Sequence, residues 1–140
     1  QLPLIRQGLK PDQSIGIISA SGTSLTRRHM EIACGGIDVP VHIRGLEGKP
    51  AFKAAVHDQV GTLDFEAVER EVVDEALAIQ KDHPETGAIL LECTDLPPYA
   101  EAVQRATGLP VFDITSLIAW AFAGVQRRHF GHAHYDGRVK

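Results

Sequence analysis

Residues 87–92 have the sequence GAILLE and indicate the centre of a sheet. This stretch is apolar over nearly its whole length, which is typical of a strand buried on both faces of a parallel sheet. Three other short apolar runs on either side of it in the chain also predict strands. They cover residues 14–20, 39–46 and 109–114.

Segments with helical periodicity separate these runs. In the clearest, residues 65–80, apolar side chains recur at spacings of three and four and predict one buried face. They are Phe65, Val68, Val72, Ala76 and Ile79. Further helices are predicted at 25–33, near 50–57, at 99–107 and from Thr115 or Ser116 to about residue 128. This alternation predicts an α/β fold, in which helices cover both faces of a four-stranded parallel sheet.

The composition excludes several classes of protein. The 140 residues are 44% hydrophobic and carry a formal net charge of −4, so the basic footprint of a nucleic-acid-binding protein is missing. Two cysteines are too few for a disulfide scaffold or a cysteine-rich zinc site. No signal peptide pattern and no membrane-spanning run is present. We therefore expect a cytoplasmic protein with no nucleic-acid or membrane partner.

The chain begins at Gln1 inside a short apolar segment, which suggests a piece of something longer. We expect residues 1–128 to form one α/β lobe and residues 129–140 to form a polar tail. The tail holds His129, His132 and His134, but no acidic or cysteine partner has a convincing spacing for a metal site. The prediction is therefore that the chain binds no metal.

Ligands of doubly wound sheets bind at the carboxyl ends of the strands. That rule selects residues 19–24, Arg44, residues 93–95 and residues 113–116. Cys93 is the best candidate, because backbone N–H groups of the following turn could lower the pKa of its thiol and bind an anion. The alternative is that Cys93 is a small buried hydrophobe.

The loop at residues 19–24 is small and rich in hydroxyl groups. It could hold a carboxylate through side-chain and backbone donors, or it could simply cap the next helix, with Ser24 at the N-cap position. It lacks the Gly-Lys-Ser/Thr sequence of a Walker loop. Cys34 follows a helix at the other edge of the predicted sheet and is interpreted as a structural thiol.

The last predicted helix is apolar nearly all round, with LIAWAFA at residues 117–123. A helix on the face of a small sheet needs only one apolar side. Two interpretations are open: the helix packs against a second domain or subunit, or it is buried deeply in the core.

Two segments of the chain resemble the aspartate/glutamate/hydantoin racemase superfamily. Residues 87–130, from GAILLECTDLPP through LPVFD, resemble its C-terminal half and its second cysteine motif. Residues 14–26, SIGIISASGTSLT, resemble the strand and hydroxyl-rich loop that open its second lobe. The resemblance covers roughly residues 2–128.

This resemblance implies a flavodoxin-like lobe of a two-lobed enzyme that has its active site between the lobes and needs no cofactor. Such enzymes use one cysteine from each lobe to exchange a proton at the substrate's α-carbon, and Cys93 matches the second-lobe cysteine. The residues assigned to substrate binding are Ser19, Ser21, Gly22, Thr23, Thr94 and Asp95. The implied partners are a small carboxylate substrate, an N-terminal lobe and a second copy of the protein.

The sequence also departs from the superfamily pattern. The first-lobe cysteine motif is absent, and Cys34 does not match it. Glu92 stands where many members have glycine, and Asp95 stands where many glutamate racemases have histidine. We expect a racemase or isomerase acting on an amino acid, a related carboxylate or a hydantoin. The alternatives are an arylmalonate-type decarboxylase with a single cysteine, or an inactive binding or assembly domain.

Overall fold

The computed structural model describes residues 1–60 and 63–127. The predicted tail, with His129, His132 and His134, lies outside the described residues. No helix in the described part of the chain combines the length and the apolar character needed to cross a bilayer.

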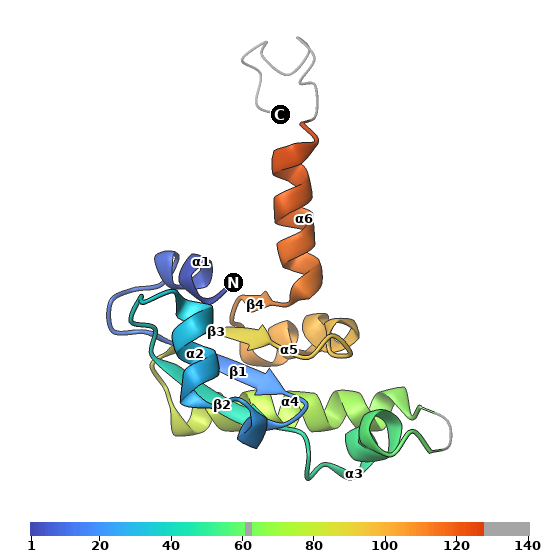
Figure 1. Cartoon of the computed structure of the whole chain (residues 1–140). Helices are drawn as coiled ribbons and strands as arrows, with labels where there is room; N and C mark the ends of the chain where they lie inside the picture. The colour runs from blue at the N-terminus through green and yellow to red at the C-terminus, as the bar shows by residue number, and fades with distance from the viewer. Residues whose placement is uncertain (61–62, 128–140) are drawn as a thin grey trace, which may run out of the picture.

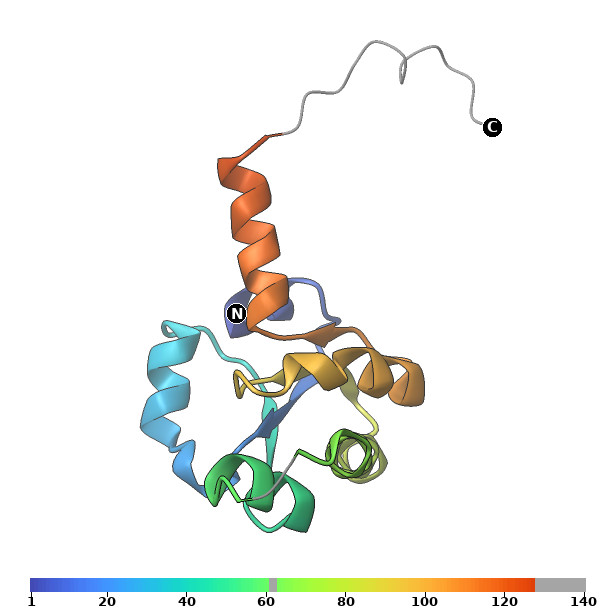
Figure 2. The same cartoon turned by 90° about the vertical axis from the view of Figure 1, so that its right-hand side faces the viewer.

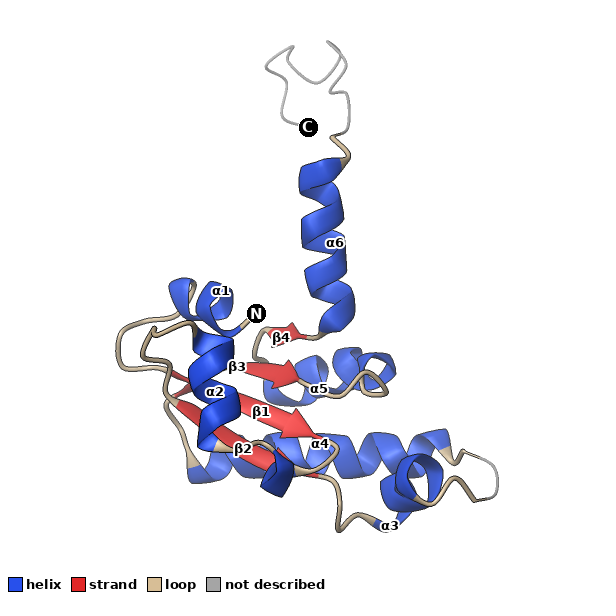
Figure 3. Ribbon diagram, in the orientation of Figure 1, coloured by secondary structure: helices blue, strands red, loops and turns tan. Residues whose placement is uncertain are grey.

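The strands form one four-stranded sheet in the order β2-β1-β3-β4, and every pair is parallel (Figures 1 and 3). Their bounds are β1 Ser14–Ser19, β2 Val41–Gly45, β3 Thr86–Leu91 and β4 Val111–Phe112. The predicted parallel sheet is confirmed. The central strands β1 and β3 are buried along their whole length, as the apolar runs indicated.

Helices cover both faces of the sheet (Figure 2). On one side lie α1 (Leu2–Gln7) and α2 (Arg27–Cys34), and on the other lie α4 (Phe65–Asp82) and α5 (Ala100–Thr107). The predicted short helix near residues 50–57 is α3 (Pro50–Phe52), continued by a π-helical turn at Lys53–His57. The predicted two-faced α/β arrangement is therefore confirmed.

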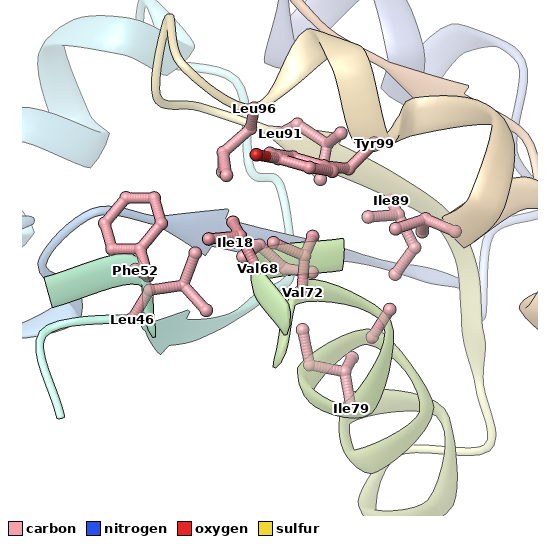
Figure 4. Packing of buried hydrophobic residues seen from close by; sticks show 12 residues of the cluster. Ile18, Leu46, Phe52, Val68, Val72, Ile79, Ile89, Leu91, Leu96 and Tyr99 are labelled. Carbon is pink, nitrogen blue, oxygen red and sulfur yellow. The ribbon is translucent and has the colours of Figure 1, made fainter. Parts of the chain in front are cut away.

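The two central strands divide their side chains between two hydrophobic cores. On β3, Ala88 and Leu90 join the α1–α2 core, while Ile89 and Leu91 join the α4–α5 core (Figure 4). This alternation follows from the two-residue period of a strand. At Gly16 of β1, a Cβ atom would lie 2.8 Å from side-chain atoms of both Ile79 and Ile89, so glycine there permits close helix packing.

Most element ends lie within two residues of the prediction, and the differences with a clear local cause are at α2 and β4. Helix α2 is capped by Thr26, because Ser24 is used in a 3-10 turn at Gly22–Ser24. Strand β4 covers only two residues of the predicted 109–114. Pro110, before it, has no N–H to add to the ladder, and Asp113, after it, caps the next helix.

That next helix, α6 (Ile114–Val125), stands away from the rest of the lobe (Figures 1 and 2). Ile118, Trp120 and Phe122 on it are 59%, 63% and 60% exposed. The interpretation of α6 as a deeply buried core helix is therefore wrong. Packing of α6 against a second domain or subunit stays a prediction.

Candidate active site

The candidate site lies at the carboxyl edge of the sheet. Because β1 and β3 are parallel neighbours, the loops that leave them start side by side (Figure 3). The hydroxyl of Ser19, at the end of β1, donates a 2.8 Å hydrogen bond to the carboxylate of Glu92, just after β3. The loops around Ser19 and Cys93, which are 74 positions apart, therefore meet as the sequence rule predicted.

Cys93 is the second residue beyond the end of β3 and is half-buried. Its thiol donates a 3.8 Å hydrogen bond to Oδ2 of Asp95. Its carbonyl accepts from the backbone N–H of Leu96 at 3.1 Å, which closes the turn before the 3-10 helix Pro97–Tyr99. The loop thus places a thiol and a carboxylate together at the edge of the sheet.

The surroundings of Cys93 favour the protonated form of its thiol. Burial raises the pKa of this thiol above its usual value, and the backbone N–H of Asp95 lowers it. The negative charges of Asp95 and Glu92 raise the pKa further, as does the hydrogen bond from the thiol to the Asp95 side chain. The activating effect that the sequence suggested for the following turn is present, but burial and nearby carboxylates oppose it.

The hydroxyl-rich loop does hold a carboxylate, and that carboxylate belongs to Glu47. The backbone N–H groups of Gly22 and Thr23 donate to Glu47 at 3.2 Å and 3.4 Å, and the Thr23 hydroxyl donates at 3.3 Å. Together with the backbone of Glu47 itself, these donors lower the pKa of Glu47. Sequence reasoning missed Glu47, because it lies 25 residues from Gly22 and no local pattern joins the two.

The other loop hydroxyls bond to one another. Ser21 Oγ lies 3.2 Å from Thr23 Oγ1 and accepts from Ser24 Oγ at 2.9 Å. At Gly22, a Cβ atom would lie 2.8 Å from the backbone nitrogen of Gly45, so this glycine lets the loop approach the end of β2. Substrate binding by Ser19, Ser21, Gly22, Thr23, Thr94 and Asp95 stays a prediction.

Two cavities flank the Cys93 loop, and Thr94 lines both. One, of about 610 Å³, lies toward α3 and the start of α4, and its wall includes Phe65, Tyr99 and Asp95. The other, of about 470 Å³, lies toward α1 and α2 and includes Glu92. The helical pattern assigned Phe65 to the buried face of α4. Phe65 is the first residue of this helix, before its buried residues begin at Val68, and it instead lines the first cavity.

Two other positions that the strand-end rule selected have structural roles. The guanidinium of Arg44 turns to α4, where it donates to Glu75 at 3.0 Å and also pairs with Asp82. The carboxylate of Asp113 accepts from the backbone N–H of Ser116 at 2.8 Å and caps α6. Cys34 is 6% exposed in the α1–α2 core, as expected of a structural thiol.

Among the described residues, His42, His83 and Glu85 are the group whose side chains could approach a metal ion. They lie near the start of β2 and the end of α4, where the strands begin, whereas Cys93 lies where the strands end. The two imidazole rings are stacked with centroids 3.4 Å apart and planes 6° apart, so their in-plane lone pairs do not converge on one point. The 2.8 Å contact between His42 and Glu85 is that of a histidine–carboxylate pair.

Comparison with known sequences finds relatives of one kind, although no family model matches the chain. The chain is 36% identical to a dimethylsulfoniopropionate lyase from Durusdinium sp. clade D, over 97% of this chain and 48% of the relative. It is 34% identical to dimethylsulfoniopropionate lyase 3 of Emiliania huxleyi, over 98% of this chain and 39% of the relative. The chain thus spans about half the length, or less, of these relatives.

Solved structures with a similar fold come from the predicted superfamily. Arylmalonate decarboxylase matches 80% of this chain and 46% of its own, with a TM-score of 0.55 and 21% identity. Allantoin racemase from Pseudomonas fluorescens matches 89% of this chain and 49% of its own, with a TM-score of 0.57 and 19% identity. The chain therefore has the fold of the aspartate/glutamate/hydantoin racemase superfamily, and its sequence is similar to those of dimethylsulfoniopropionate lyases.

Proposed function

We propose that this chain carries one side of the active site of a lyase that acts on dimethylsulfoniopropionate or a close β-sulfonium carboxylate. The observation that carries this proposal is the 36% identity to a dimethylsulfoniopropionate lyase over 97% of the chain. The position of Cys93 at the carboxyl edge of the sheet supports it, since a thiol there can act on a bound carboxylate.

The reaction starts with proton removal from the carbon next to the substrate carboxylate. The Cys93 thiolate takes that proton, and the electron pair of the C–H bond becomes the carbon–carbon double bond. The bond from the β-carbon to sulfur breaks, and its electron pair leaves with dimethyl sulfide. Acrylate is the second product, and the proton taken up by Cys93 passes to solvent, so atoms and charges balance.

The raised pKa of Cys93 is compatible with this role. A thiol with a raised pKa is a stronger base once it is deprotonated, which helps it to remove a weakly acidic C–H proton. The developing negative charge on the substrate carboxylate needs fixed donors. We assign that task to the Thr94 hydroxyl. The hydroxyls of Ser19 and Ser21 are already bonded to Glu92 and Thr23, so they serve the substrate where its carboxylate replaces those partners.

A racemase or isomerase is the second candidate, favoured by the fold shared with allantoin racemase. It would begin with the same proton removal but would return a proton to the opposite face of the α-carbon. That step requires a second acid opposite Cys93. Within this chain the other thiol is Cys34, which is buried in the α1–α2 core. Elimination needs one thiol, and the sequence similarity to dimethylsulfoniopropionate lyases favours it over racemisation.

The test is product formation by the full-length protein. We expect dimethyl sulfide in the headspace and acrylate in solution when dimethylsulfoniopropionate is added. Cys93→Ser should lower the rate by about 10² to 10⁴, the usual contribution of a general acid or base. Cys34→Ala, which alters the buried thiol, serves as the control and should retain most of the activity.

Other outcomes would contradict the lyase proposal. Exchange of the α-proton of an amino acid or hydantoin in deuterated water, without release of dimethyl sulfide, would favour the racemase. An arylmalonate that loses carbon dioxide would favour the decarboxylase. Activity that survives Cys93→Ser would exclude the assigned role of this thiol, and no turnover of any of these compounds would favour a binding or assembly domain.

We also propose that α6, whose exposed apolar side chains lie on more than one side of the helix, packs on another lobe or on a second copy of the protein. The exposure of Ile118, Trp120 and Phe122 supports this, because large apolar surfaces of this kind mark interaction sites. Replacing Trp120 and Phe122 by serine should lower the mass measured by light scattering if α6 joins two copies. An unchanged mass with reduced thermal stability would favour contact within one chain.

A further inference from the structure

We propose that the 610 Å³ cavity beside Cys93 binds the cationic sulfonium group of the substrate, with Asp95 as its counter-charge and Phe65 and Tyr99 as its aromatic walls. This inference rests on the proposed function and deepens it. It assigns substrate specificity to Asp95, the residue that follows Cys93 and Thr94.

The cavity is apolar and aromatic over most of its wall. Phe65 comes from the start of α4 and Tyr99 from the turn before α5, and their ring centroids lie 4.8 Å apart with planes tilted by 37°. Phe52 and Val68, from the core shown in Figure 4, continue the wall. Such a wall suits methyl groups, and aromatic faces attract cations whose charge is spread over methyl groups.

Asp95 is the one charged residue among the described residues that line this cavity. No lysine or arginine in that lining neutralises it. A second carboxylate acts nearby, because Glu69 and Asp95 both raise the pKa of Tyr99, after the larger effect of its burial. The cavity therefore has an apolar wall and a negative potential, the combination that a desolvated organic cation requires.

A wholly anionic substrate would be repelled by this arrangement. Glu92 and Asp95 flank the thiol on either side in sequence, and the carboxylate charge of each raises the pKa of Cys93. A β-sulfonium carboxylate has its cation separated from the α-carbon by a single carbon atom. The separation of 3.8 Å between Cys93 Sγ and Asp95 Oδ2 matches that scale, so one group can reach the α-proton while the other reaches the sulfonium.

Binding of the cation would also act on the thiol. The carboxylate of Asp95 accepts the hydrogen bond of Cys93, and its charge helps to keep the proton on sulfur. A sulfonium group beside Asp95 offsets that charge and brings a positive charge close to the thiol. The substrate would thus favour the thiolate that removes its own α-proton, whereas the free site favours the protonated thiol.

The experiment compares dimethylsulfoniopropionate with 4-methylpentanoate, in which an uncharged CH replaces the sulfonium sulfur. The full-length protein is treated with iodoacetamide at increasing concentrations of each compound. The fraction of alkylated Cys93 peptide is then measured by mass spectrometry. The ligand concentration that halves the alkylation rate reports binding. It does not depend on how fast the free thiol of each variant reacts. Asp95→Asn and Phe65→Leu are the test variants, and Glu101→Gln on the outer side of α5 is the charge control.

We expect dimethylsulfoniopropionate to protect Cys93 at a concentration at least tenfold lower than 4-methylpentanoate. Asp95→Asn should remove most of that preference, and Phe65→Leu should reduce it several-fold, while Glu101→Gln keeps it. Equal protection by both compounds, or a preference that survives Asp95→Asn, would overturn the assignment of the cavity and leave the proposed function standing. If neither compound protects Cys93, the proposed function itself is wrong.

Discussion

The thiol of Cys93 donates a hydrogen bond to the carboxylate of Asp95, over 3.8 Å and across a single intervening residue. The contact joins the atom proposed to move the proton to the group proposed to hold the cation. It also makes the reactivity of the thiol depend on the charge of its neighbour, and this dependence can be measured without any substrate.

Replacing Asp95 by Asn should activate the free thiol. The substitution removes a negative charge that raises the pKa of Cys93, and it leaves in place the backbone N–H that lowers it. Because the thiolate is the reactive form, alkylation at pH 7 should become several-fold faster, and the pH profile of the rate should move to lower pH. The rate of alkylation is obtained by stopping the reaction at successive times and measuring the alkylated Cys93 peptide. An unchanged profile would show that Asp95 does not act on the thiol.

The two cysteines should differ in reactivity. Cys93 is half-buried in a loop, whereas Cys34 is 6% exposed between α2 and the sheet, and burial raises the pKa of both thiols. We expect iodoacetamide to label Cys93 at least tenfold faster than Cys34, and the rate at Cys93 to rise with pH as its thiol ionises. Faster labelling of Cys34 would mean that α2 opens readily or that the Cys93 loop is closed to solvent.

The approach of the hydroxyl-rich loop to β2 depends on Gly22. In Gly22→Ala the new Cβ would lie 2.8 Å from the backbone nitrogen of Gly45, and a backbone atom cannot move aside as a flexible side chain can. We expect a loss of about 1–3 kcal/mol in the free energy of unfolding, as for other overpacked sites.

Gly48→Ala is the matched control for that substitution. No atom lies within 4 Å of the position its Cβ would occupy, so its effect should stay within about 0.5 kcal/mol. Urea denaturation followed by circular dichroism gives both values. Equal losses for the two variants would indicate that the packing of Gly22 against Gly45 is not what sets stability here.

Substitutions in helix α4 directly test the packing of the α4–α5 core. Ile79 is fully buried against the sheet, and Leu77, two residues earlier, is 40% exposed. Ile79→Ala should cost about 2–5 kcal/mol because it leaves a cavity. Leu77→Ala should cost less than about 1 kcal/mol. Thermal or urea unfolding distinguishes them, and a similar cost for both would contradict the assigned orientation of α4.

Much of the fold was determined by local sequence patterns. The apolar run at 87–92 and its three counterparts predicted parallel strands, and the spacing of Val68, Val72, Ala76 and Ile79 predicted the buried face of α4. These predictions succeed because strand and helix periods are properties of the backbone itself. The strand-end rule also placed Cys93 and Ser19 at one edge, because parallel strands bring their carboxyl ends together.

Which groups meet at that edge depends on how distant segments pack. Glu47 occupies the donors of the hydroxyl-rich loop, Arg44 turns away to Glu75, and Phe65 joins the wall of a cavity. Each outcome depends on a contact between residues that are distant in sequence, and periodicity holds no information about such contacts. Local sequence patterns were therefore enough to predict the sheet and the edge where Cys93 lies. The packing of one segment on another decided the charge and shape of the site.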